Sequence, residues 1–147
     1  MKTILSLAFA IMMIVTAGCG SDTIKVSGKI TLEDDTPVVG ANVFFVSGIT
    51  QGRGTTNADG VYSLSFKKTN DGIPAGSYQV LVVGAFFTPD NVVIRDDMDT
   101  GSRPMIDYVY AVTETTPLTC EVPNAKGYDF VVEPSDFYKR MRRSQSP

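Results

Sequence analysis

Carboxylates and two cysteines are the side chains of this sequence that could carry chemistry, because histidine is absent. Histidine is the usual general base near neutral pH and the commonest metal ligand in proteins, so most catalytic triads and zinc sites are excluded. The net charge of −3 argues against nucleic acid as a partner, since proteins bind nucleic acid mainly through basic contacts to phosphate. We therefore predict a protein that is not an enzyme and does not bind nucleic acid.

Asp97 and Asp99 form the local acidic pattern that comes nearest to a metal site. They lie two residues apart before Gly101, a spacing that loops use to wrap Ca²⁺ with oxygen ligands. The distal glutamate of an EF-hand is missing, so we favour a solvated acidic loop and keep a calcium site at Asp97 and Asp99 as an alternative. Paired carboxylates could also hydrolyse glycosides in a cleft, but the acidic residues here fall in turns and on outward strand phases.

Cys120 lies on the same side of a predicted strand as Leu118 and Val122. A reactive thiolate needs a basic neighbour or another group that lowers its pKa. We therefore predict that Cys120 is a buried structural cysteine rather than a nucleophile.

Residues 1–18 have the pattern of a leader. Lys2 precedes an almost unbroken apolar run from Ile4 to Val15, which matches the n-region and h-region of a signal peptide. The run is shorter than the roughly 20 apolar residues of a membrane-spanning helix. We therefore expect removal of this segment on export.

Thr16-Ala17-Gly18-Cys19 resembles the lipobox of bacterial lipoproteins. The resemblance implies cleavage before Cys19, a diacylglycerol on its thiol and an acyl chain on its new amino group, and we expect no other cofactor. Each buried CH₂ contributes about 0.8 kcal/mol, so such an anchor is effectively permanent. Gly20 rather than aspartate follows the cysteine, which favours the outer membrane of a double-membrane cell, with the protein facing the periplasm or the cell surface. The alternative is an ordinary signal peptide with a cysteine at its cleavage site.

The mature chain alternates apolar and polar residues, as half-buried strands do. No segment has a sustained period of 3.6 residues, and turns rich in Gly, Pro and Asn separate the strands. This favours one Ig-like antiparallel β-sandwich of about seven strands with Greek-key connections. We expect a linker at residues 19–23, the sandwich at 24–133 and a basic C-terminal tail at 134–147. Alternation is clear at residues 24–32, 41–45, 62–66, 78–82, 118–122 and 128–132.

A long irregular segment runs from Phe86 to Arg103. Loops of this length are usually functional or disordered, so we expect a partner-contact loop here. For its two aromatic residues we favour core packing and keep exposure at a contact surface as the alternative. Its candidate contact residues are Phe86, Phe87, Asp90, Arg95 and Arg103.

The C-terminal tail contains the basic run from Lys139 to Arg143. We expect this tail to be unpacked. It would then either contact anionic lipid headgroups or remain solvated.

Several segments are similar to the carboxypeptidase regulatory-like domain of bacterial lipoproteins, over roughly residues 24 to 133. The resemblance implies a transthyretin-like β-sandwich but does not by itself fix a function. Asp107-Tyr108-Val109 departs from the pattern of that group. The similar segments are residues 26–30, 40–43, 56–62, 73–78, 115–122 and 128–130.

These observations predict a membrane-anchored, noncatalytic lipoprotein that binds or braces another envelope component. Its partner would be an envelope protein or a glycan, and the chain itself would be a monomer. The alternative is a calcium-dependent or carbohydrate-binding module.

Overall fold

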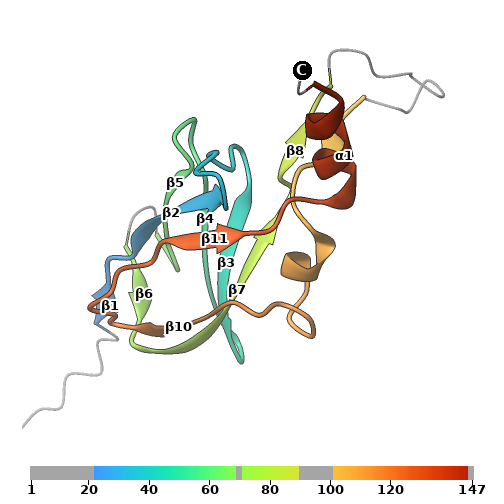
Figure 1. Ribbon diagram of the computed structural model, residues 1–147. Helices are drawn as coiled ribbons and strands as arrows, with labels where there is room; N and C mark the ends of the chain where they lie inside the picture. The colour runs from blue at the N-terminus through green and yellow to red at the C-terminus, as the bar shows by residue number, and fades with distance from the viewer. Residues whose placement is uncertain (1–21, 69–70, 90–100, 146–147) are drawn as a thin grey trace, which may run out of the picture.

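A computed structural model of the chain describes residues 22–68, 71–89 and 101–145, and seven strands in it form two layers (Figure 1). This confirms the predicted all-β sandwich. Within the described residues β11 pairs with β2 in parallel, whereas the other neighbouring strands are antiparallel. One layer has the order β10 (Thr119–Val122), β7 (Gly76–Val83), β3 (Asn42–Ser47) and β4 (Thr50–Thr55). The other has the order β11 (Phe130–Val132), β2 (Ser27–Leu32) and β5 (Val61–Ser63).

The shorter elements lie at the two ends of the sandwich (Figure 1). At one end, β1 (Thr23–Ile24) pairs with β6 (Ile73–Pro74). At the other end, β8 (Phe86–Phe87) pairs with β9 (Arg103–Pro104). The 3₁₀ helix η1 (Tyr108–Ala111) and the helix α1 (Asp136–Gln145) lie toward this second end. The described chain therefore begins at the end remote from α1.

An aromatic cluster forms the centre of the core. Phe45 is fully buried, and four other rings have centroids 6.0 to 6.3 Å from its own. All five residues fall on inward phases of the alternating pattern, so the sandwich core follows directly from the sequence. The four partner rings are those of Tyr62, Tyr78, Tyr128 and Phe130.

The strand β4 has no apolar alternation, because two of its residues that face the other sheet are glycines. A Cβ at Gly52 would lie 2.2 Å from Cγ2 of Ile73, and a Cβ at Gly54 would lie 2.4 Å from the carbonyl oxygen of Ser63. The chain comes so close here that only glycine fits. The hydrophobic pattern therefore could not reveal this strand.

The C-terminal tail is packed, and the expectation of an unpacked tail is wrong. Residues 136–145 form α1, and Ser135 caps it because its Oγ accepts a 3.1 Å hydrogen bond from the backbone N–H of Tyr138. The ring of Tyr138 lies edge-on to Phe87 with a centroid distance of 4.8 Å. Arg142 also forms an ion pair with Asp34. These contacts hold the helix against β8 and the β2 end of the sandwich.

Candidate functional site

An apolar groove of about 410 Å³ lies where the end of β7, the β8–β9 pair, η1 and the start of α1 meet. Aromatic side chains from three different elements line it: Phe86, Tyr108 and Phe137. We call it the aromatic groove. The side chains of Phe86 and Tyr108 are 59% and 75% exposed, although large apolar residues are normally buried. Exposed aromatic residues that flank a concave surface are typical of contact sites.

The turn after β7 sets the wall that Phe86 forms. Gly84 has a φ of +76°, a backbone conformation that favours glycine. The following residues pair with β9, since the N–H of Met105 donates a 2.9 Å hydrogen bond to the carbonyl oxygen of Ala85. Because successive side chains of a strand point to opposite faces, Phe86 is exposed while Phe87 packs against Tyr138.

The wall that contains Tyr108 is fixed by its neighbours. Asp107 precedes η1, and its Oδ1 accepts a 3.0 Å hydrogen bond from the N–H of Val109. The hydroxyl of Tyr110, whose ring is buried, accepts a 3.0 Å hydrogen bond from the N–H of Glu133. The first bond caps η1 and the second holds it against the segment that leads into α1. The side chain of Tyr108 is exposed to solvent.

The third wall belongs to the first turn of α1. The N–H of Ser135 donates to the carbonyl oxygen of Met105 at 3.0 Å, and its Oγ donates to that of Pro104 at 2.6 Å. Phe137 also lies 6.0 Å from Phe87 between ring centroids. The start of the helix is therefore tied to β9 on one side and to β8 on the other.

Three of the predicted contact residues lie in the part of the chain that the structure describes. Phe86 lines the groove, Phe87 packs under α1, and Arg103 lies beside them in β9, where its guanidinium donates to the carbonyl oxygen of Ser102 at 2.9 Å. Asp90 and Arg95 lie outside the described residues. Sequence reasoning missed Tyr108 and Phe137 as groove residues, because each lies in a different element from Phe86 and no local motif connects them.

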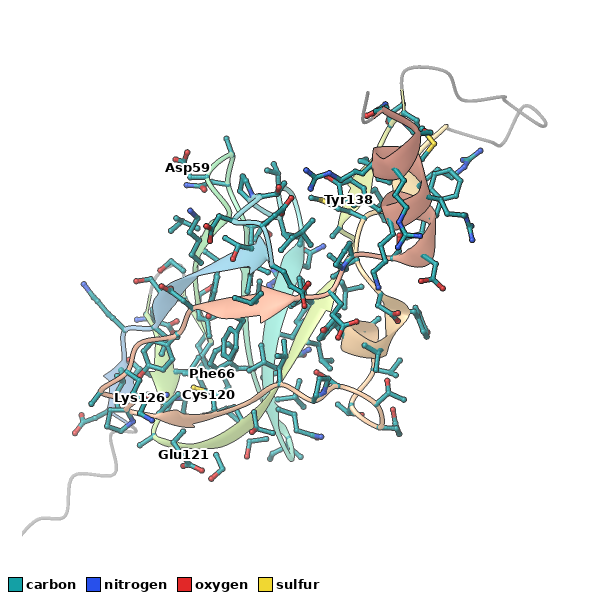
Figure 2. The ribbon with its side chains drawn as sticks, viewed as in Figure 1. Asp59, Phe66, Cys120, Glu121, Lys126 and Tyr138 are labelled. Carbon is teal, nitrogen blue, oxygen red and sulfur yellow. The ribbon has the colours of Figure 1, made fainter. Side chains whose placement is uncertain are left out.

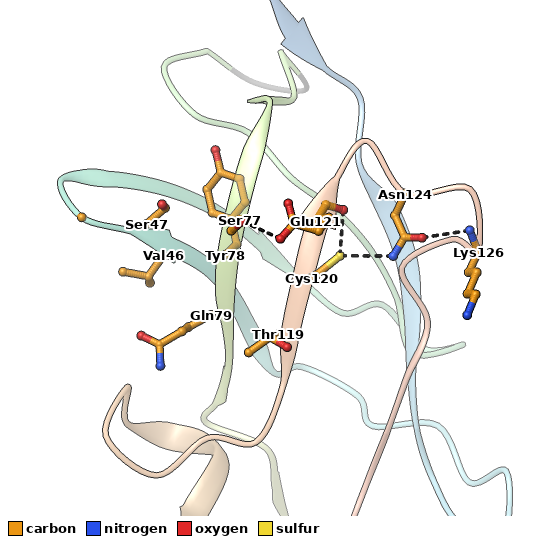
Figure 3. Close-up of a pocket in the computed structure, with 11 residues that line it drawn as sticks. Val46, Ser47, Ser77, Tyr78, Gln79, Thr119, Cys120, Glu121, Asn124 and Lys126 are labelled. Carbon is orange, nitrogen blue, oxygen red and sulfur yellow. Dashed lines mark hydrogen bonds between the residues drawn. The ribbon is translucent and has the colours of Figure 1, made fainter.

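A second, polar hollow of about 780 Å³ lies over β3, β7 and β10, at the end of the molecule remote from Tyr138 (Figures 2 and 3). Hydroxyl and amide side chains are among its lining residues, and Oγ of Ser77 donates to a carboxylate oxygen of Glu121 at 2.5 Å. Cys120 is buried, and its Sγ accepts a 3.7 Å hydrogen bond from Nδ2 of Asn124. Burial raises the pKa of the Cys120 thiol, so the predicted structural role of this cysteine agrees with its surroundings.

Other predicted sites fall outside the described residues, namely Cys19 and the calcium candidates Asp97 and Asp99. Within residues 22–68, 71–89 and 101–145, no group of three or more acidic or cysteine side chains is arranged to hold a metal ion. In the same residues no helix combines the length and apolarity that a membrane crossing requires.

Comparisons of the chain with models of protein families, with curated proteins and with solved structures each found no match.

Proposed function

We propose that this protein is a lipid-anchored, noncatalytic binding module of a bacterial cell envelope, and that its partner binds in the aromatic groove. The lipobox-like sequence that ends at Cys19 supports the anchor, and the absence of histidine from the sequence supports a noncatalytic role. The observation that carries the proposal is the placement of exposed aromatic residues. Phe86 and Tyr108 flank a concave apolar surface at the end of the sandwich opposite to β1 (Figure 1).

The position of the groove suits an anchored protein. The described chain starts at β1, only a few residues after Cys19. A lipid on Cys19 would hold the β1 end of the sandwich near the membrane surface. The β8–β9 end would then face away from the membrane, where it is accessible to another envelope component.

Binding in the groove can be separated from anchoring by removing the lipid. The mature chain, residues 19–147 with Cys19→Ser, is mixed with washed cell envelopes, and the amount that sediments is measured. We expect saturable sedimentation that is lost in the double variant Phe86→Ser and Tyr108→Ser. Because both side chains are already exposed, these substitutions should leave the fold intact, which circular dichroism checks.

The matched control is Ile49→Ser, which removes a fully exposed apolar side chain in the turn between β3 and β4. It should sediment like the parent chain. Sedimentation that does not depend on Phe86 and Tyr108, or that is equally weakened by Ile49→Ser, would overturn the assignment of the groove.

A further inference from the structure

We infer that the aromatic groove takes a short polypeptide segment in which a large apolar side chain is adjacent to Lys or Arg. This inference rests on the proposed function and specifies the chemistry of the partner. Its basis is the contrast between the apolar walls of the groove and the sign of the charges beside them.

The size of the groove suits side chains of a peptide. A volume of about 410 Å³ falls at the small end of the range for ligand sites. It has room for a few large side chains. Its walls are held before any ligand arrives, because Asp107 caps η1 and Ser135 is bonded to β9. A site fixed in this way loses little conformational entropy on binding.

The charges that line the groove have one sign. Within the described part of the chain, the charged side chains among its lining residues are Asp107 and Asp136. The ammonium of Lys139 lies 4.0 Å from Asp136 and 3.8 Å from Glu133; the Lys139 side chain is 37% exposed and the two carboxylates are 85% and 62% exposed. Because both carboxylates face solvent and Lys139 is shared between them, it neutralises Asp136 only in part. A cationic side chain at the rim would therefore be attracted and an anionic one repelled.

The two basic residues in the last turn of α1 lie away from this rim. Asp136 begins the helix, whereas Arg142 and Arg143 lie in its last turn, about 9 Å further along the helix axis. Arg142 is in addition paired with Asp34. The positive end of α1 therefore does not cancel the acidic rim of the groove.

A polypeptide fits the lining of the groove better than a glycan does. Each sugar hydroxyl that is buried needs a hydrogen-bond partner. Among the side chains that line the groove, the hydroxyl of Ser135 already donates to the carbonyl oxygen of Pro104. The remaining polar side chains are those of Asp107, Tyr108 and Asp136. They are enough for one cationic group, whereas a sugar chain would leave hydroxyls without partners.

The test uses defined probes and the mature chain with Cys19→Ser. Fluorescence anisotropy measures binding of labelled acetyl-Lys-Leu-Phe-Lys-amide, of the same peptide with Glu in place of Lys, and of the same peptide with Ser in place of Leu and Phe. In a fourth experiment, an N-acetylglucosamine tetramer is added as a competitor of the bound Lys-Leu-Phe-Lys peptide. We expect the Lys-Leu-Phe-Lys peptide to bind at least about tenfold more tightly than either variant peptide. The sugar should not displace it.

Variants of the acidic rim, which consists of Asp107 and Asp136, test whether these carboxylates attract the peptide. Asp107→Asn with Asp136→Asn should weaken binding of the Lys peptide by about threefold to tenfold. Asparagine still caps η1, so the fold is retained. Asp59→Asn, at an exposed turn, is the matched control and should change nothing.

Two outcomes overturn the inference. One is equal binding of the Lys and Glu peptides, and the other is displacement by the sugar tetramer in a manner that requires Tyr108. In both cases, envelope sedimentation that still depends on Phe86 and Tyr108 would leave the proposed function standing. Loss of that dependence would refute the proposed function itself.

Discussion

The hydroxyl of Tyr62 donates a 2.7 Å hydrogen bond to the carbonyl oxygen of Tyr128 inside the core. This bond ties β5 to the segment that leads into β11. A Cβ at Gly28 of β2, which lies between these strands, would come within 2.0 Å of the same carbonyl oxygen. Tyr128 therefore reaches Tyr62 only because residue 28 has no side chain. Burial raises the pKa of the Tyr62 hydroxyl.

Tyr62→Phe should lower the free energy of unfolding by about 1 to 3 kcal/mol, because it leaves a buried carbonyl group without this donor. Urea denaturation followed by circular dichroism measures the change. Tyr108→Phe, which removes a hydroxyl from a 75% exposed side chain, is the control and should be neutral. Equal stability of the two variants would show that the Tyr62 bond has no structural role.

The ion pair between Asp34 and Arg142 predicts a dependence on acid pH. The hydrogen bond from Arg142 lowers the pKa of the Asp34 carboxyl from 3.8 to about 2. Because this pKa is lower in the folded state, the stabilisation is present above about pH 4 and disappears as the pH falls toward 2. Both groups are substantially exposed, so the effect on stability is small.

NMR titration of the Asp34 side-chain carboxyl carbon measures this pKa directly. Arg142→Gln should move the midpoint up toward 3.8, whereas Lys126→Gln, a basic residue at the other end of the molecule (Figure 2), should leave it unchanged. A midpoint that ignores Arg142→Gln would show that α1 is not held to Asp34 in solution.

Cys120 should be inert toward alkylation in the folded protein at neutral pH. Its thiol is buried and burial raises its pKa, so little thiolate forms and reagents do not reach it. Mass spectrometry after iodoacetamide treatment should find Cys120 unmodified in buffer and fully modified in urea. Rapid modification in buffer would mean that the polar hollow opens to the thiol.

The proposed lipid anchor predicts the start and the mass of the N-terminal peptide. The N-terminal peptide of the protein isolated from membranes should begin at Cys19 and carry the mass of a diacylglycerol plus an acyl chain. Cys19→Ser should abolish this modification. An unmodified peptide that begins at Cys19 would indicate an ordinary signal peptide, and the protein would then be released from the membrane.

The sequence predicted the layers of the fold better than its ends. Alternating residues such as Val43, Phe45, Val80 and Val82 identify strands because one face of each is buried. β4 was not predicted, because two of its inward positions are glycines. Glycine is required there by the close approach of Ile73 and Ser63, which are remote in sequence. Local spacing does not contain that information.

The packing of helix α1 and the composition of the groove likewise depend on contacts between residues that are remote in sequence. Ser135 followed by Asp136 and a basic end is a helix signal, but the run of Lys and Arg favoured a solvated tail. Phe86 could be identified as a contact residue from its place in a long loop. Its neighbours Tyr108 and Phe137 come from other elements, and only the tertiary fold brings them to the same groove.

Hydroxyl-radical footprinting in intact cell envelopes tests most directly whether the aromatic groove holds a partner. Oxidation rates of Phe86 and Tyr108 are compared between envelopes and the purified protein, with the fully exposed Ile49 as an internal reference. We predict that Phe86 and Tyr108 are protected in envelopes while Ile49 is oxidised at the same rate in both. Unchanged rates at Phe86 and Tyr108 would contradict the account.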